Sequence, residues 1–262
     1  MDGEYLSHLR FADDIVLIAN NPAELQELIS DLNAASNEVG LKMNLAKTKA
    51  MYNELVDDQD LIINNTTLDR VEEYVYLGQL IHKSGSLLPE INRRMKLAWA
   101  AFGRNAIIFK SRMPIPLKKR AFDQCILPIM TYGCETWILK KEIIRKLQVT
   151  QKSMERCMLG ITKRDRKRIE WIRQKTQVID IIHRIKSLKW QWAGHLARRT
   201  DNRWSTKITL WYPRGFKRPR GRPNLRWDHD IRKQAGITWP RKANNRKLWA
   251  QMKNDYVREA TP

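Results

Sequence analysis

Cysteine is scarce in this sequence, and its spacing builds no framework. The chain holds three cysteines, Cys125, Cys134 and Cys157, and no CxxC pair. This spacing predicts neither a disulfide scaffold nor a zinc finger, even with His183 and His195 counted as further ligands. It favours a reduced, intracellular compartment. No apolar run approaches the roughly 20 residues of a membrane-spanning helix, and the first residues carry no secretory signal pattern, so we expect no membrane partner.

Positive charge is scarce in the first third of the chain, and negative charge is scarce in the rest. Residues 1–82 hold 5 Lys/Arg against 15 Asp/Glu, a balance of −10, whereas residues 83–262 hold 44 against 13, a balance of +31. All ten tryptophans also follow residue 82. Basic charge interleaved with aromatic side chains is typical of a surface that tracks phosphates and stacks on bases. A merely soluble basic protein is the alternative.

Residues 8–19 predict a β-hairpin with Ala12, Asp13 and Asp14 at its tip, because two short apolar runs flank the adjacent carboxylates. An ordinary surface turn usually carries Gly, Asn or Pro beside its Asp, and none is present here. Paired carboxylates suit divalent-metal binding, since hard cations take oxygen ligands and two metals can clamp a phosphoryl displacement. A plain hairpin turn remains the alternative.

Residues 9–17, Leu-Arg-Phe-Ala-Asp-Asp-Ile-Val-Leu, resemble the catalytic hairpin of reverse transcriptases. The form with Leu-Arg in front is similar to that of the non-long-terminal-repeat (LINE-type) retrotransposons, which encode an endonuclease and a reverse transcriptase. The resemblance implies that Asp13 and Asp14 are catalytic residues and metal ligands for Mg²⁺ in the intact enzyme. It implies an RNA template and a DNA primer or target as partners, with no small-molecule cofactor beyond deoxynucleotides.

Two further segments follow in the family's order. Residues 41–52 resemble the next polymerase motif, which implies that Lys47 or Lys49 approaches phosphates; a solvated strand edge protected by lysines is the alternative. Tyr76-Leu77-Gly78 lies where these enzymes carry the small hairpin that grips the primer backbone, which implies roles for Tyr76 and Gly78 in nucleic-acid binding. A collinear match over about 80 residues is more specific than any single motif.

The rest of the chain has helical periodicity, which recurs over residues 91–106, 142–159, 178–192 and 243–257. By resemblance, residues 83–138 are a thumb-like helical region. Residues 131–137 and 190–199 are similar to further segments of the same retrotransposon group, and no role for residues 131–137 follows from their chemistry.

Residues 139–262 hold 34 Lys/Arg against 10 Asp/Glu and form a basic, Trp-rich region for which we expect nucleic-acid binding. The cations concentrate in two places. The first comprises Lys163, Arg164, Arg166, Lys167 and Arg168, and the second contains Arg218, Arg220 and Arg222. The second stretch resembles the core of an AT-hook, which lies in a narrow A·T minor groove. A solvated connector or a nuclear import signal is the alternative.

The sequence therefore predicts an α+β fold. Residues 1–82 would form part of a reverse-transcriptase palm (a hairpin with a helix and short strands), followed by the thumb-like region and the basic C-terminal region. A polymerase also needs fingers and a third carboxylate from an upstream strand, and twelve residues precede Asp13 here. We thus expect a fragment of a LINE-type RNA-directed DNA polymerase, a nucleotidyltransferase that is inactive alone, in the nucleus. The alternative is a truncated or co-opted, non-enzymatic nucleic-acid-binding protein.

Overall fold

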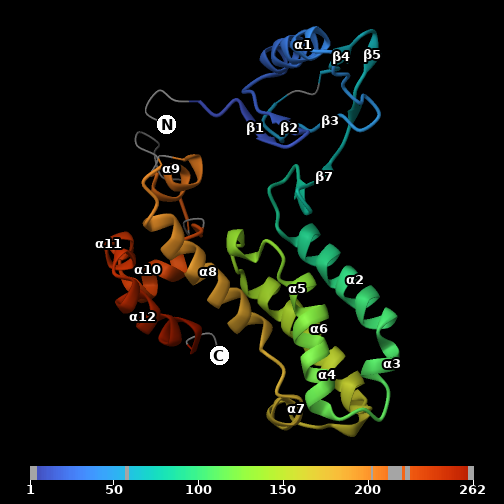
Figure 1. Ribbon diagram of the computed structural model, residues 1–262, viewed down its shortest axis with the longest axis vertical. Coiled ribbons are helices and arrows are strands. Elements are labelled where there is room, and N and C mark those ends of the chain that lie inside the picture. Colours follow the sequence, from blue (N-terminus) through green and yellow to red (C-terminus); the bar gives the residue numbers. More distant parts are fainter. Residues whose placement is uncertain (1–4, 57–58, 202, 212–219, 222–224, 259–262) are drawn as a thin grey trace. The chain divides into compact units, whose positions relative to one another are not determined.

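The computed structural model describes residues 5–56, 59–201, 203–211, 220–221 and 225–258. The chain divides into two compact units, Met1–Ser86 and Leu87–Pro262 (Figure 1). The first unit mixes one helix with short strands, and the second is helical. The α+β class predicted from the sequence is therefore confirmed.

The described residues of the first unit form helix α1 (Pro22–Glu38) and four two-stranded sheets. The strands are β1 (His8–Phe11), β2 (Asp14–Leu17), β3 (Lys49–Ala50), β4 (Ile62–Ile63), β5 (Thr66–Thr67), β6 (Asp69–Arg70), β7 (Glu73–Tyr76) and β8 (Gln79–His82). Three of the pairs, β1–β2, β4–β5 and β7–β8, are antiparallel hairpins, and β3 pairs with β6 in parallel.

Helix α1 begins and ends where local chemistry dictates. The side chain of Asn21 accepts a hydrogen bond from the backbone N–H of Glu24 at 2.8 Å, and Pro22 occupies the first helical position. Gly40 follows the helix with φ of +76°, a backbone conformation that glycine adopts without steric cost. One side chain, Gln26, connects the helix to strand β4 by two hydrogen bonds. Gln26 donates to the carbonyl of Ile62 at 2.9 Å and accepts from its N–H at 2.8 Å.

The core of this unit is small. Five hydrophobic side chains are buried in it, from Ile29, Ala50, Leu61, Ile63 and Leu68. The β1–β2 hairpin instead leaves large apolar side chains in solvent, with Phe11 62% exposed. Only the end of β2, at Leu17, packs against this core, and a two-stranded hairpin with so little packing is only marginally stable in water.

We therefore predict that amide hydrogen exchange is fast in the β1–β2 hairpin. Its amides should exchange through local opening, whereas the buried helices of the second unit should open only with global unfolding. Exchange followed by mass spectrometry and corrected for intrinsic rates measures both in one sample. If residues 8–17 proved to be the best-protected segment of the chain, our account of a weak first unit would be wrong.

The second unit is built from helices. They are α2 (Leu88–Arg104), α3 (Ala106–Phe109), α4 (Ile115–Ala121), α5 (Leu127–Met130), α6 (Lys141–Leu159), α7 (Ile169–Thr176), α8 (Ile181–Ala197), α9 (Trp204–Leu210), α10 (His229–Ala235), α11 (Trp239–Asn244) and α12 (Arg246–Arg258). A π-helical turn, η1 (Phe122–Ile126), joins α4 to α5, and η2 (Cys134–Thr136) and η3 (Lys163–Asp165) are short 3₁₀ turns. No helix within the described ranges has the length and apolar character that crossing a membrane requires.

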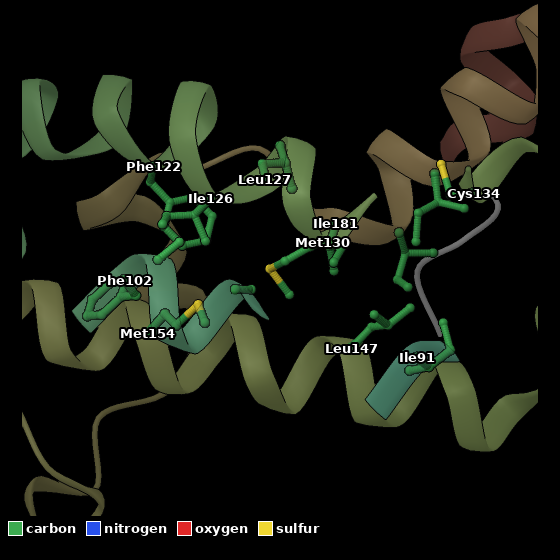
Figure 2. Packing of buried hydrophobic residues seen from close by; sticks show 14 of the residues in the cluster. Ile91, Phe102, Phe122, Ile126, Leu127, Met130, Cys134, Leu147, Met154 and Ile181 are labelled. Carbon is green, nitrogen blue, oxygen red and sulfur yellow. The ribbon is translucent and has the colours of Figure 1, made fainter. Parts of the chain in front are cut away.

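The larger core of this unit joins helices from both regions predicted after residue 82. Figure 2 shows Phe102 of α2, Met130 of α5, Met154 of α6 and Ile181 of α8 among the side chains that fill it. The rings of Phe102 and Phe109 stack with their centroids 4.3 Å apart. Residues 83–138 and the start of residues 139–262 thus share one hydrophobic cluster.

A second hydrophobic cluster forms where α8 contacts α11 and α12 (Figure 1). We call it the tryptophan cluster, and its buried residues are Trp190, Ala193, Ile231, Ala235, Trp239, Ala243, Trp249 and Tyr256. The rings of Trp190 and Trp249 stack at 3.9 Å. Each indole N–H donates to the other residue's carbonyl, Trp190 at 2.9 Å and Trp249 at 3.0 Å. Gly194 makes this approach possible, because a Cβ there would lie 2.5 Å from Nε1 of Trp249. The segment 190–199 therefore has a packing role.

Candidate functional site

The β1–β2 hairpin places the two adjacent carboxylates in different backbone positions. Phe11 pairs with Asp14 across the hairpin, so Ala12 and Asp13 form its two-residue turn. Ala12 has φ of +50°, in the left-handed region. Both Asp13 and Asp14 are exposed, Asp13 in the turn and Asp14 at the start of β2. The predicted hairpin is confirmed, and its tip presents both side chains to solvent.

The side chains of Asp13 and Asp14 supply the kind of ligand atom that a divalent cation binds. Carboxylate oxygens are the ligands that Mg²⁺ prefers, although a Mg²⁺ ion needs six ligands in all. Among the described residues, no group of three or more His, Cys, Asp or Glu side chains is arranged to hold a metal ion. The pair therefore fits part of a metal site, and its remaining ligands would have to come from water, substrate or other residues.

The lysines predicted to approach phosphates differ in their surroundings. Lys49 lies in β3, and its Nζ is 2.5 Å from Oδ2 of Asp69 on the neighbouring strand β6. Lys47 is exposed and makes no ion pair with any residue that the structure describes. Tyr76 ends β7, and Gly78 lies in the tight turn before β8, where its φ is +77°. The predicted hairpin at Tyr76–Gly78 is present.

The first basic stretch forms an exposed turn that begins with η3. Asp165 accepts from the backbone N–H of Thr162 at 2.6 Å and from its hydroxyl at 2.9 Å, which closes the turn and lowers the pKa of the Asp165 carboxyl. All five cations around it are exposed, namely Lys163, Arg164, Arg166, Lys167 and Arg168. The Nζ of Lys167 also lies 5.5 Å from the ring centre of Trp171 on α7. The turn thus presents positive charge to solvent from a fixed backbone.

The second basic stretch is described only in part. Arg220 is exposed, whereas Arg218 and Arg222 lie outside the described residues. The AT-hook therefore stays a prediction, with a solvated connector or a nuclear import signal as its alternative.

The aromatic part of the sequence interpretation is wrong for four of the tryptophans. Trp137, Trp190, Trp239 and Trp249 are each at most 4% exposed and pack in hydrophobic clusters, so none of them can stack on a base. Trp99 and Trp211, 38% and 40% exposed, keep accessible rings. Nucleic-acid binding is therefore supported by the exposed basic charge and not by the number of tryptophans.

Sequence reasoning also missed two groups of polar residues. Lys189, with 2% of its side chain exposed, is bound to Asp230 at 2.9 Å inside the tryptophan cluster. A basic groove also lies between α8 and α12, lined by Arg184 and Lys253 among others. No sequence signal could have joined these residues, because they lie far apart in the chain and meet only through helix packing.

Comparisons with known proteins agree with the order of the motifs. Residues 4–81 match the family described as reverse transcriptase (RNA-dependent DNA polymerase), a range that includes the Asp13/Asp14 hairpin. The chain is also 40% identical over 267 residues to a transposon-derived protein of Caenorhabditis elegans, with 95% of each chain covered. No solved structure matches the chain. Residues 4–81 are thus a reverse-transcriptase-related segment, and the chain belongs to a family of transposon-derived proteins.

The predicted resemblance to retrotransposon reverse transcriptases is therefore confirmed. The reverse-transcriptase family that residues 4–81 match implies a nucleotidyltransferase that generally uses divalent metals, with template and primer nucleic acids as partners.

Proposed function

We propose that the chain carries part of the RNA-directed DNA polymerase of a LINE-type retrotransposon. The observation that supports this most is the exposed pair Asp13 and Asp14 at the tip of a hairpin that lies within the matched reverse-transcriptase range. In this proposal residues 1–82 belong to the palm, residues 83–138 to the thumb and residues 139–262 to a nucleic-acid-binding region. The protein works inside the cell, in the nucleus, where its DNA target lies.

Asp13 and Asp14 are the proposed Mg²⁺ ligands of the intact enzyme. When bound, divalent cations neutralise and orient the phosphates in the transfer of a nucleotide. The part of this chain is to hold the two carboxylates at the tip, Asp13 by the turn and Asp14 by its pairing with Phe11. We further propose that the primer and template run past Lys47, Tyr76 and Gly78.

We expect the purified chain of residues 1–262 to incorporate no labelled deoxynucleotide on a primed RNA template in the presence of Mg²⁺. In the described part of the chain, Asp13 and Asp14 have no third metal-binding side chain beside them, and a polymerase site needs more ligands and a pocket for template and nucleotide. The matched control is the Asp13→Ala/Asp14→Ala chain, which should give the same background. Incorporation by the wild-type chain that disappears in this variant would show that the chain is an active polymerase.

A second candidate function is supported by the exposed cationic turn at residues 163–168. A chain that binds RNA or DNA through the phosphates needs no metal site, and the helical second unit has its own large core. Sequencing the transcript upstream of the Met1 codon separates the two candidates. An open frame that continues into a palm strand with its own Asp supports the polymerase, and a start codon at Met1 supports the co-opted binding protein.

A further inference from the structure

A groove of about 500 Å³ lies between the first half of α8 and the last turns of α12. Both walls belong to the second unit. The polar lining residues are His183, Arg184 and Ser187 from α8 and Lys253, Asn254 and Arg258 from α12, and Ile179 and Val257 add apolar surface. The proposed functions assign residues 139–262 to nucleic-acid binding as a region and name none of these side chains.

The lining combines positive charge with hydrogen-bond donors. Arg184, Lys253 and Arg258 are cations, and the other three polar residues can all donate a hydrogen bond. No acidic side chain lines the groove in the described part of the chain. Like charges gathered in this way repel one another, so an anion in the groove would stabilise them.

The groove cations differ from the cations inside the same unit. Lys189 is paired with Asp230 and Lys119 with Asp123. Arg184 and Lys253, in contrast, make no ion pair with a described residue, so their charges are available to a ligand. An arginine and a lysine on facing walls suit phosphate oxygens, which accept charge-assisted hydrogen bonds from both.

The walls are held in place by contacts behind the groove. The Asp180 carboxylate caps α8, accepting from the N–H groups of Ile182 at 2.8 Å and His183 at 3.2 Å. The Nζ of Lys186 donates to the carbonyl of Tyr256 at 3.1 Å, which ties the end of α12 to α8. These contacts fix the two helices that carry Arg184 and Lys253, and preorganisation of this kind favours binding.

We propose that this groove binds the phosphate groups of a polynucleotide strand. The proposal rests on the proposed nucleic-acid binding of the chain and names one place where it occurs. A free nucleotide carries the same phosphate groups, so the experiment measures binding of a polynucleotide and of a nucleotide separately.

The test uses the full chain and two double variants with equal loss of charge. The groove variant is Arg184→Gln/Lys253→Gln. The control is Lys141→Gln/Arg145→Gln, which removes one lysine and one arginine from exposed positions on α6. Fluorescence anisotropy gives the affinity for a labelled single-stranded RNA decamer and for a fluorescent ATP analogue at two salt concentrations. Thermal unfolding checks that both variants are folded.

The groove variant is expected to bind RNA about tenfold to a hundredfold more weakly, since each charged hydrogen bond contributes on the order of a tenfold change. Its log–log salt slope should flatten by roughly 1.4, from two lost contacts at about 0.7 each. The control should lose less than about threefold, and Arg184→Lys should retain most of the affinity.

The possible results distinguish phosphate binding in the groove from nucleic-acid binding elsewhere on the chain. RNA binding that both double variants weaken equally would overturn the groove while leaving nucleic-acid binding intact. Binding of the ATP analogue alone, lost in the groove variant, would support a phosphate site and contradict the polynucleotide as its ligand. If neither probe binds the wild-type chain, both the groove and the proposed nucleic-acid binding are wrong.

Discussion

The Gly194→Ala variant is expected to lose about 3 kcal/mol or more of its free energy of unfolding. The new Cβ would lie 2.5 Å from Nε1 and 2.7 Å from Cδ1 of Trp249, closer than packed atoms allow. Trp249 cannot move aside cheaply, because its ring is buried and stacked on Trp190. Overpacking costs about 1–3 kcal/mol, and each of the two indole hydrogen bonds contributes about 1 kcal/mol more.

Gly103→Ala is the matched control for this change. Gly103 lies in the last turn of α2, and a Cβ there would meet no atom within 4 Å. Alanine should therefore stabilise the helix by up to about 1 kcal/mol. Urea unfolding followed by tryptophan fluorescence measures both variants. If Gly194→Ala were as stable as Gly103→Ala, the packing role of residues 190–199 would be contradicted.

Asp230→Ala should cost about 3–5 kcal/mol, because it leaves a buried ammonium group without its partner. The Asp230 carboxylate accepts from Nζ of Lys189 at 2.9 Å and from the hydroxyl of Tyr256 at 2.6 Å. Burial lowers the pKa of Lys189, while the charges of Asp230 and Asp228 act to raise it. Removing Asp230 therefore takes away the larger part of what keeps Lys189 charged inside the cluster.

A double variant tests whether the loss comes from the pair. Asp230→Ala combined with Lys189→Met removes the orphaned charge, so this double variant should be more stable than Asp230→Ala alone. Chemical unfolding of the wild type, both single variants and the double variant gives the coupling energy. An additive result, with no coupling between the two positions, would show that the ion pair does not stabilise the tryptophan cluster.

Features set by neighbouring residues were predictable from the sequence. The apolar runs around Asp13 and Asp14 marked the hairpin, which the structure has between His8 and Leu17. The helix expected over residues 243–257 is present as α12 but begins at Arg246, because the chain leaves the helical conformation at Asn245, whose side chain caps α12 by accepting from the N–H of Leu248. A capping signal inside a periodic stretch is easily read as helix interior.

Features that depend on distant residues were not predictable. Lys47 or Lys49 was predicted to approach phosphates, and the pairing of Lys49 with Asp69 follows from the parallel alignment of β3 with β6, which no local pattern indicates. The tryptophans looked like stacking residues, yet Trp190 and Trp249 find each other across two helices. Periodicity shows which face of a helix is apolar and not which helix will cover it.

We propose above all that residues 139–262 bind nucleic acid through its phosphates, with little sequence preference. The most direct test of this proposal is the dissociation constant of the full chain for single-stranded RNA and for A·T-rich and G·C-rich duplex DNA, measured at several salt concentrations. We expect affinity to fall steeply with salt, with a log–log slope of about −0.9 per phosphate contact on duplex DNA and about −0.7 on single strands. The two duplexes should bind alike. Binding that does not change with salt would contradict the claim.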